Sequence, residues 1–176
     1  MIYNKVLSVD SVELATVREI YESSFPVDER RAYDLLLALL AHEESFTLEA
    51  ICNEDRVEGM LASWQLDEWR YVEHFAIEAS RRGAGIGREV LCDFLERDNS
   101  PVVLEVEPPT DYDSCHRIAF YRSMGFVLHD TYRYIQPSYG AGREAVELCL
   151  MTYAAPAECN LDRLSLLLHR RVYGVR

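Results

Sequence analysis

Apolar residues recur along this chain in two patterns, a helical one near the start and short strand-like runs further on. Residues 11–23 carry apolar side chains at roughly helical spacing, with Ser11 or Asp10 as the candidate N-cap. The segment 25–31 predicts a turn. It leads into a second helix that runs to about Ala41, with an inward face made of Leu35, Leu36, Leu39 and Leu40.

The rest of the chain alternates between strands and helices without a regular repeat. Helices are predicted at 85–97 and 114–124, the second of them ended by Gly125 as a C-cap. Strands are predicted at residues 46–52, 57–66, 71–77, 101–107, 126–135 and 144–153. The resulting order is α, α, β, β, β, α, β, α, β, β. It predicts an α+β fold, with a mixed, largely antiparallel central sheet flanked by helices.

Residues 156–176 follow the last predicted strand and have a helical pattern of their own. Asn160 is the candidate N-cap, and cationic side chains stand in the last turn. One face carries Leu161, Leu164, Leu168 and Val172, with Leu167 beside them. A helix this short needs burial, either on its own sheet or on a second copy of the chain, and the homodimer is the favoured alternative. We therefore expect a domain at 1–155 and a C-terminal helical extension at 156–176.

Composition and charge narrow the class of partner. The formal net charge of −12 repels phosphate backbones and attracts cations, so we expect no nucleic acid and favour an amine-bearing partner. The N-terminus lacks a signal-peptide pattern, and no apolar run is long enough to span a bilayer, so we expect no membrane partner. Five scattered cysteines without a CxxC pair predict reduced thiols, no metal site and a cytoplasmic location.

A glycine-rich turn after the predicted strand 71–77 opens directly into a helix. The first N–H groups of a helix lack internal partners and carry partial positive charge, and glycines let a diphosphate approach them closely. The turn and its flanking cations therefore predict a diphosphate site, and an ordinary solvated turn is the alternative. The residues concerned are Arg82, Gly83, Ala84, Gly85, Ile86, Gly87 and Arg88.

Two well-known diphosphate motifs do not fit this turn. A P-loop would need Lys and Ser or Thr after Gly87, where Arg88 and Glu89 stand. A dinucleotide fingerprint would need a third glycine at the position of Arg88. The pattern that does fit, Arg82-x-x-Gly85-x-Gly87, resembles the acetyl-CoA motif of the GNAT superfamily of N-acetyltransferases.

Two neighbouring segments carry the same resemblance. The strand before the turn ends in HFAI, and Tyr121 opens a Tyr-x-x-x-Gly-Phe sequence that resembles the later helix of the superfamily. The order of elements is similar from about residue 11 to 153. The resemblance implies acetyl-CoA as acyl donor, with its diphosphate on residues 82–88 and its pantetheine arm along Phe75, Ala76 and Ile77. Ser114 stands where members often have an asparagine that contacts this arm.

The resemblance implies transfer of an acetyl group to a primary amine of a small molecule or peptide by direct attack. It makes Tyr121 the acid for the departing thiolate, and a core aromatic is the alternative. Glu73 is the candidate base because it lies two residues before Phe75 and so on the same strand face. A surface or salt-bridged carboxylate is the alternative, and a bulge would bring His74 into its place. The alternative function is a non-catalytic, regulatory acyl-CoA-binding module, which the presence of Glu73 and Tyr121 disfavours.

The acceptor site is expected among aromatic and acidic residues of the N-terminal helices and the last hairpin, since rings and carboxylates suit an organic cation. Its main candidates are Glu29, Tyr33, Trp64, Glu107 and Tyr139. Glu105 shares a strand with Glu107, and either is a candidate counter-charge for the amine, with a solvated strand edge as the alternative. Further candidates are Phe25, Asp28, Trp69, Tyr132 and Tyr134. The identity of the acceptor does not follow from the sequence.

Overall fold

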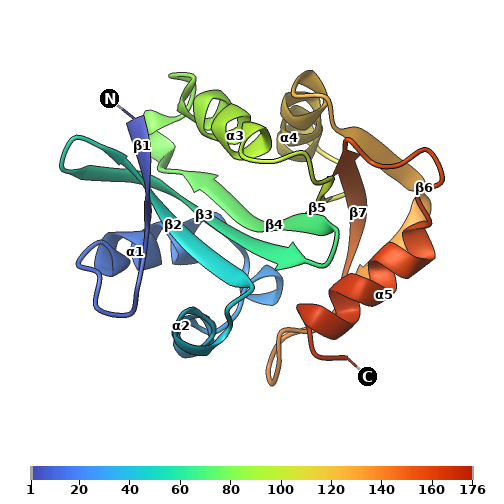
Figure 1. Ribbon diagram of the computed structural model, residues 1–176, viewed down its shortest axis with the longest axis horizontal. Coiled ribbons are helices and arrows are strands. Elements are labelled where there is room, and N and C mark those ends of the chain that lie inside the picture. The colour runs from blue at the N-terminus through green and yellow to red at the C-terminus, as the bar shows by residue number, and fades with distance from the viewer. Residues whose placement is uncertain (1, 176) are drawn as a thin grey trace. The chain divides into compact units, whose positions relative to one another are not determined.

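The computed structural model describes residues 2–175, and its contacts divide the chain into two compact units. Unit 1 consists of Met1–Gln65 and Val72–Asn99, and unit 2 of Leu66–Tyr71 and Ser100–Arg176. The strand order is β1-β2-β3-β4-β5-β7-β6, and β4 (Trp69–Ile77) has residues in both units (Figure 1). None of the helices between residues 2 and 175 is long and apolar enough to cross a membrane.

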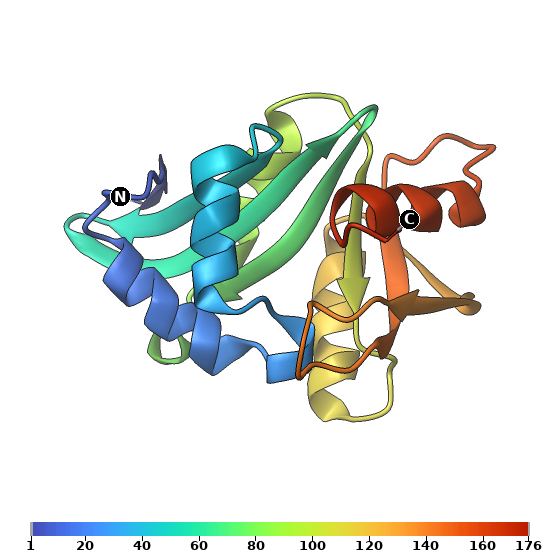
Figure 2. The same ribbon diagram turned by 90° about the horizontal axis from the view of Figure 1, so that it is seen from below.

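Unit 1 is a sheet covered by helices on both faces. Its other strands are β1 (Ile2–Val6), β2 (Phe46–Asn53) and β3 (Arg56–Leu66), and its helices are α1 (Leu14–Ser24), α2 (Tyr33–His42) and α3 (Ile86–Glu96). The pairs β1–β2 and β2–β3 are antiparallel. Within this unit α3 covers one face of the strands, and α1 and α2 cover the other (Figures 1 and 2). The predicted inner face of α3 is confirmed, because Ile86, Val90, Leu91, Phe94 and Leu95 are buried.

Unit 2 has a smaller sheet with one helix on each face. It contains β5 (Val102–Val106), β6 (Val127–Gln136), β7 (Val146–Tyr153), α4 (Tyr112–Ser123) and α5 (Leu161–Arg171). Strand β7 lies between β5 and β6 and is antiparallel to both, with a register shift in β6 between His129 and Tyr134. The predicted α+β class with a largely antiparallel sheet is thus confirmed.

Two predictions about the N-terminal segment are wrong, and one strand there was missed. Strand β1 was not predicted, because Tyr3 and Val6 are exposed and the strand carries little hydrophobic signal. Neither Ser11 nor Asp10 caps α1, which begins after Glu13 without a side-chain cap, while the Ser11 hydroxyl accepts a hydrogen bond from the Ser8 N–H at 2.9 Å. The leucine-rich face of α2 is also less buried than expected. Leu36 is buried there, whereas Leu35 is exposed and Leu39 and Leu40 are half-buried.

The helix of the C-terminal extension packs on the chain itself. Asn160 caps α5, since its Oδ1 accepts from the Arg163 N–H at 3.0 Å. Leu164, Leu168 and Val172 are buried, and Arg171 pairs with Asp67 at 2.9 Å within unit 2. Of the two burials that the sequence left open, the structure has the one on the chain itself for these three residues, and the homodimer stays a prediction.

Candidate active site

The glycine turn adopts the backbone conformation that its sequence requires. Gly85 forms the N-cap of α3 with φ 83°, and Gly83 has φ 81°, both in the left-handed region that side chains disfavour. A Cβ built at either position would have no neighbour within 4 Å. Within residues 2–175 the space beside the turn is therefore open, and no side chain of this range caps the start of α3. Both properties suit a site where a phosphate approaches backbone N–H groups.

The arginines of the turn have different surroundings. The Arg82 Nε donates to the Ile77 carbonyl at 3.0 Å, which closes the turn onto the end of β4, and Arg82 is otherwise exposed. Arg81 instead lies 2.9 Å from the carboxylate of Glu58, a buried residue of β3. Arg88 is exposed on the first turn of α3. Arg81 is a cation that flanks the predicted diphosphate site, and it is engaged by Glu58, whose burial has no local sequence signal.

The end of β4 packs closely against both neighbouring elements of unit 1. A Cβ on Gly59 of β3 would lie 2.5 Å from the Ala76 carbonyl oxygen, so only glycine fits there. Phe75 and Ile77 are half-buried against a cluster that includes Ile86 at the start of α3. The predicted pantetheine-binding segment Phe75–Ile77 is thus held from two sides.

Glu73 is a buried, salt-bridged carboxylate. Its side chain has no exposed surface, and its Oε1 accepts from Arg31 Nε at 3.1 Å and pairs with Arg31 Nη2 at 3.0 Å. Its Oε2 accepts from the Trp64 indole N–H at 2.7 Å. The structure therefore brings together the predicted base and one predicted acceptor residue, Trp64. Arg31, 42 positions away in the sequence, was not predicted.

His74 lies against the same N-terminal segment. Its Nε2 is 2.9 Å from the Glu29 carbonyl, and its ring meets Tyr21 and Phe25 edge-on at 4.9 and 4.6 Å between centroids. Burial lowers the pKa of His74, so the ring is neutral near pH 7. Glu73 was preferred to His74 as the base because neighbouring residues of a strand point to opposite faces. Both side chains nevertheless contact the segment 25–31, so this alternation alone does not decide which of them is the base.

Tyr121 is a buried phenol of α4 in unit 2. Its ring packs against Phe120 and Phe126 at 5.3 and 5.6 Å, and 7% of the residue is exposed. Among the described residues its hydroxyl has no hydrogen-bond partner, so it is available to a ligand atom. Burial raises the pKa of Tyr121 to about 12, which keeps the phenol protonated at neutral pH.

Ser114 has a local role that the sequence analysis missed. Asp111 caps α4: its Oδ1 accepts from the Ser114 N–H at 2.8 Å, and the Ser114 hydroxyl accepts from the Asp111 N–H at 3.1 Å. The Ser114 hydroxyl, which the family resemblance places near the pantetheine arm, is thus part of a capping box. The helix consequently begins at Tyr112, two residues before the predicted start.

The remaining acceptor candidates have contacts of their own, Tyr33 and Glu29 within unit 1, and Glu107 and Tyr139 within unit 2. The Tyr33 hydroxyl donates to the Leu14 carbonyl at 3.2 Å and joins α2 to α1. Glu107 is paired with Arg117, and Glu29 contacts His74 through its backbone. Glu105, by contrast, accepts hydrogen bonds from the hydroxyls of Tyr134 and Tyr173, and Tyr139 lies next to Tyr173.

The sheet of this chain and its glycine turn at the start of α3 can be compared with known proteins. The model of the acetyltransferase (GNAT) family matches residues 14–126, and the chain belongs to this family of acyltransferase enzymes. The superfamily resemblance inferred from the sequence is confirmed.

Solved structures agree with this membership. A GNAT-family protein from Bacteroides thetaiotaomicron is 31% identical, with a TM-score of 0.91 over 99% of each chain. Arabidopsis thaliana NAA60 in complex with acetyl-CoA has a TM-score of 0.65 at 14% identity over 87% of this chain and 98% of that one, a likeness of fold alone. Among curated proteins, YjbC of Bacillus subtilis is 26% identical over 104 residues, which are 58% of this chain. The match spans about half, 52%, of YjbC.

Proposed function

We propose that this protein is an acetyl-CoA-dependent N-acetyltransferase that acts on a primary amine of a small molecule or peptide. The open glycine turn at the start of α3 carries the proposal, because it offers the N–H groups of a helix start, a helix dipole and the exposed Arg82 to a diphosphate. Family membership supports the same donor.

In the proposed reaction each residue has a limited task. The turn at Arg82–Arg88 holds the diphosphate, and the backbone of Phe75–Ile77 runs along the pantetheine arm. The amine nitrogen attacks the thioester carbon, the C–S bond breaks, and the amine loses a proton. Tyr121 donates its phenolic proton to the departing sulfur, since its hydroxyl has no other partner among the described residues.

Glu73 receives a different role from the one its position on the strand suggested. Both of its oxygens already accept hydrogen bonds, from Arg31 and from Trp64. We propose that Glu73 is a positioning residue that holds Arg31 and Trp64 against β4. The proton of the amine then leaves through water or another group.

The cysteines bear on the cellular setting of the protein. All five cysteines are free thiols, which suits a reducing compartment, so the cytoplasm is the proposed location. We keep the division into a domain at 1–155 and an extension at 156–176 as a proposal about how the chain elaborates its family fold.

Thiol release from acetyl-CoA, measured with a panel of primary amines, tests the proposed function. Release that depends on an added amine, with mass spectrometry showing the acetylated amine, supports an N-acetyltransferase. Acetyl-CoA binding without transfer to any amine would instead support the regulatory acyl-CoA-binding module.

A further inference from the structure

Helix α3 is held against the sheet of unit 1 at both of its ends by a buried glutamate. At the C-terminal end, both carboxylate oxygens of Glu49 on β2 accept from Arg97, the C-cap residue of α3, at 2.9 Å. At the N-terminal end, Oε1 of Glu58 on β3 lies 2.9 Å from Nε of Arg81. Arg81 ends the short 3₁₀-helix that precedes the glycine turn. Both glutamates are buried, and all four residues belong to unit 1.

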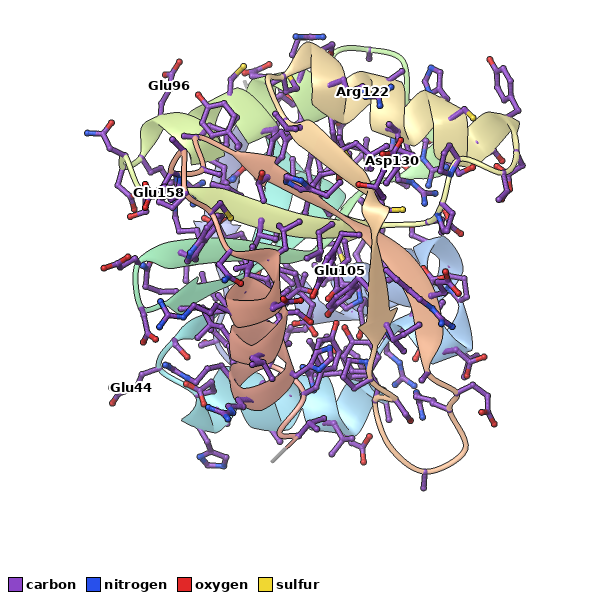
Figure 3. The ribbon with its side chains drawn as sticks, turned by 90° about the vertical axis from the view of Figure 1, so that its right-hand side faces the viewer. Glu44, Glu96, Glu105, Arg122, Asp130 and Glu158 are labelled. Atoms are coloured by element: carbon purple, nitrogen blue, oxygen red, sulfur yellow. The ribbon has the colours of Figure 1, made fainter. Side chains whose placement is uncertain are left out.

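The pair at the C-terminal end is fully hydrogen-bonded. Arg97 donates to Glu49 through Nη1 and to Asp93, one turn earlier on the same helix, through Nη2 at 2.9 Å. The preceding residue, Glu96, is exposed and points away from the strands (Figure 3). This pair therefore holds the end of α3 that lies opposite the glycine turn.

The pair at the N-terminal end is less completely hydrogen-bonded. Among the described residues, Oε2 of Glu58 has no hydrogen-bond partner, and Arg81 Nε, although close to Oε1, is not aligned for a hydrogen bond. Asn53 Nδ2 donates to the same Oε1 at a long 3.5 Å. A buried ion pair with incomplete hydrogen bonding is a weak source of stability, because both ions have lost hydration. Stability alone therefore does not account for this pair.

Glu58 lies where the two predicted parts of the donor site meet. Its carbonyl accepts from the Glu78 N–H at 2.8 Å, directly after the predicted pantetheine segment Phe75–Ile77. Its carboxylate pairs with Arg81, directly before the predicted diphosphate segment Arg82–Arg88. The backbone and the side chain of one residue thus hold both ends of the short segment that joins β4 to the glycine turn.

The charge of the pair distinguishes two possible roles for Arg81. In the structure this charge is balanced by Glu58. If Arg81 bound the diphosphate directly, removal of the Glu58 charge would release a cation and strengthen donor binding. If Arg81 instead holds the turn in place, the same removal would loosen the turn and weaken donor binding. The two roles therefore predict opposite signs for one substitution.

We propose that Glu58 is a positioning residue of the donor site. Through Arg81 it holds the glycine turn at a fixed place relative to the end of β4, so that one acetyl-CoA molecule can reach both. The inference rests on the proposed function, because acetyl-CoA is the ligand concerned. A residue of this kind contributes to affinity through the backbone that it holds, without touching the ligand.

Calorimetric titration of acetyl-CoA into wild type, Glu58→Gln and Glu49→Gln tests the inference. The control is closely matched, since the arginine side chains of the two pairs are 37% and 36% exposed and both glutamate side chains are 3% exposed. Each variant leaves an arginine without its carboxylate, so both should lower the thermal unfolding midpoint. We expect Glu58→Gln to bind at least about fivefold more weakly than wild type, and Glu49→Gln to change affinity by less than about twofold.

Three results of this titration overturn the proposal. They are an unchanged affinity in a folded Glu58→Gln protein, a tighter affinity in that protein, and an equal loss in both variants. Glu58→Asp and Glu49→Asp, which keep the charge but shorten the side chain, replace the glutamine variants if Glu58→Gln does not fold. The same loss is expected for Glu58→Asp, because Arg81 must move to keep its partner.

A double variant separates position from stability. Glu58→Leu combined with Arg81→Met replaces the ion pair by apolar side chains, so no buried charge is left without a partner, and much of the thermal midpoint should return. We expect its acetyl-CoA affinity to stay at least about fivefold below that of wild type. Recovery of affinity together with the midpoint would show that the pair only stabilises the fold, and would overturn the proposal.

The two proposals fail in different ways. If the wild-type protein binds acetyl-CoA but acetylates no amine, the proposed function fails, and a selective loss of binding in Glu58→Gln still supports the positioning role. If wild type binds no acetyl-CoA, the donor site is wrong and the positioning role fails with it. If wild type acetylates amines and Glu58→Gln binds acetyl-CoA equally well, the positioning role is wrong and the proposed function stands.

Discussion

The indole N–H of Trp64 on β3 donates to the Oε2 of Glu73 on β4 at 2.7 Å. The opposite oxygen of the same carboxylate holds Arg31. A residue predicted as a base is thereby engaged on both sides by donors within unit 1. This changes what its substitution should do.

Glu73→Gln should slow acetyl transfer by a similar factor at every pH between 6 and 9, because a positioning residue does not take up the amine proton. It should also lower the free energy of unfolding by on the order of 3 kcal/mol, since the buried Arg31 guanidinium loses its charged partner. Transfer rates across pH and urea unfolding measure both effects. A rate deficit that is large at pH 6 and small at pH 9 would restore Glu73 as the base.

Tyr121→Phe should lower kcat by about 10²–10⁴-fold with little change in acetyl-CoA affinity, because a proton donor to the sulfur acts in the transition state. Since the pKa of Tyr121 is raised to about 12, the acid stays protonated throughout the neutral range. Wild-type kcat should therefore show no loss of this acid up to about pH 10. Tyr112→Phe, at an exposed tyrosine of the same helix, is the control. Full activity of the Tyr121→Phe variant would show that Tyr121 is a core aromatic residue and not the acid.

His74 should make stability fall on mild acidification. Its pKa is lowered in the folded protein, so the unfolded chain binds the proton more readily, and the stabilising contribution is present above about pH 6.5 and lost below it. Thermal unfolding of wild type and His74→Phe between pH 7.5 and 5.5 tests this sign. The variant should show a smaller decrease than wild type, and His42→Phe, at an exposed histidine, should match wild type. Parallel curves for all three proteins would show that His74 does not cause the loss of stability at low pH.

Gly59→Ala and Gly83→Ala separate a steric requirement from a conformational one. The Gly59 variant would place a Cβ 2.5 Å from the Ala76 carbonyl and should cost roughly 1–3 kcal/mol, with weaker acetyl-CoA binding because the β4 backbone shifts. The Gly83 variant meets no atom but keeps φ near 81°, which should cost roughly 1–2 kcal/mol. Chemical denaturation compares them. An unaffected Gly59→Ala protein would show that β3 and β4 are not packed this tightly.

Local patterns account for what the sequence could predict. The helix face of α3 and its glycine N-terminus follow from spacing and from the backbone freedom of Gly83 and Gly85, all within one short segment. The cap of α4 is local too, but Asp111 was placed in a loop, so the capping role of Ser114 was not predicted.

Contacts between distant segments account for what it could not predict. Arg31 and Glu73 are 42 positions apart, and Glu105 and Tyr173 are 68 apart, so neither pair leaves a periodic signal. Tyr173, which donates to Glu105, lies beyond the residues matched by the family model.

Calorimetric titration of acetyl-CoA into wild type, Gly85→Asp and Gly142→Asp tests the central claim most directly. Gly85 and Gly142 both have positive φ, 83° and 76°, and open space beside them, so both variants add the same strain and the same negative charge. The account predicts that Gly85→Asp loses acetyl-CoA affinity by at least about tenfold, through bulk and charge at the diphosphate, while Gly142→Asp binds like wild type. Unchanged affinity in a folded Gly85→Asp protein, or an equal loss in both variants, would contradict it.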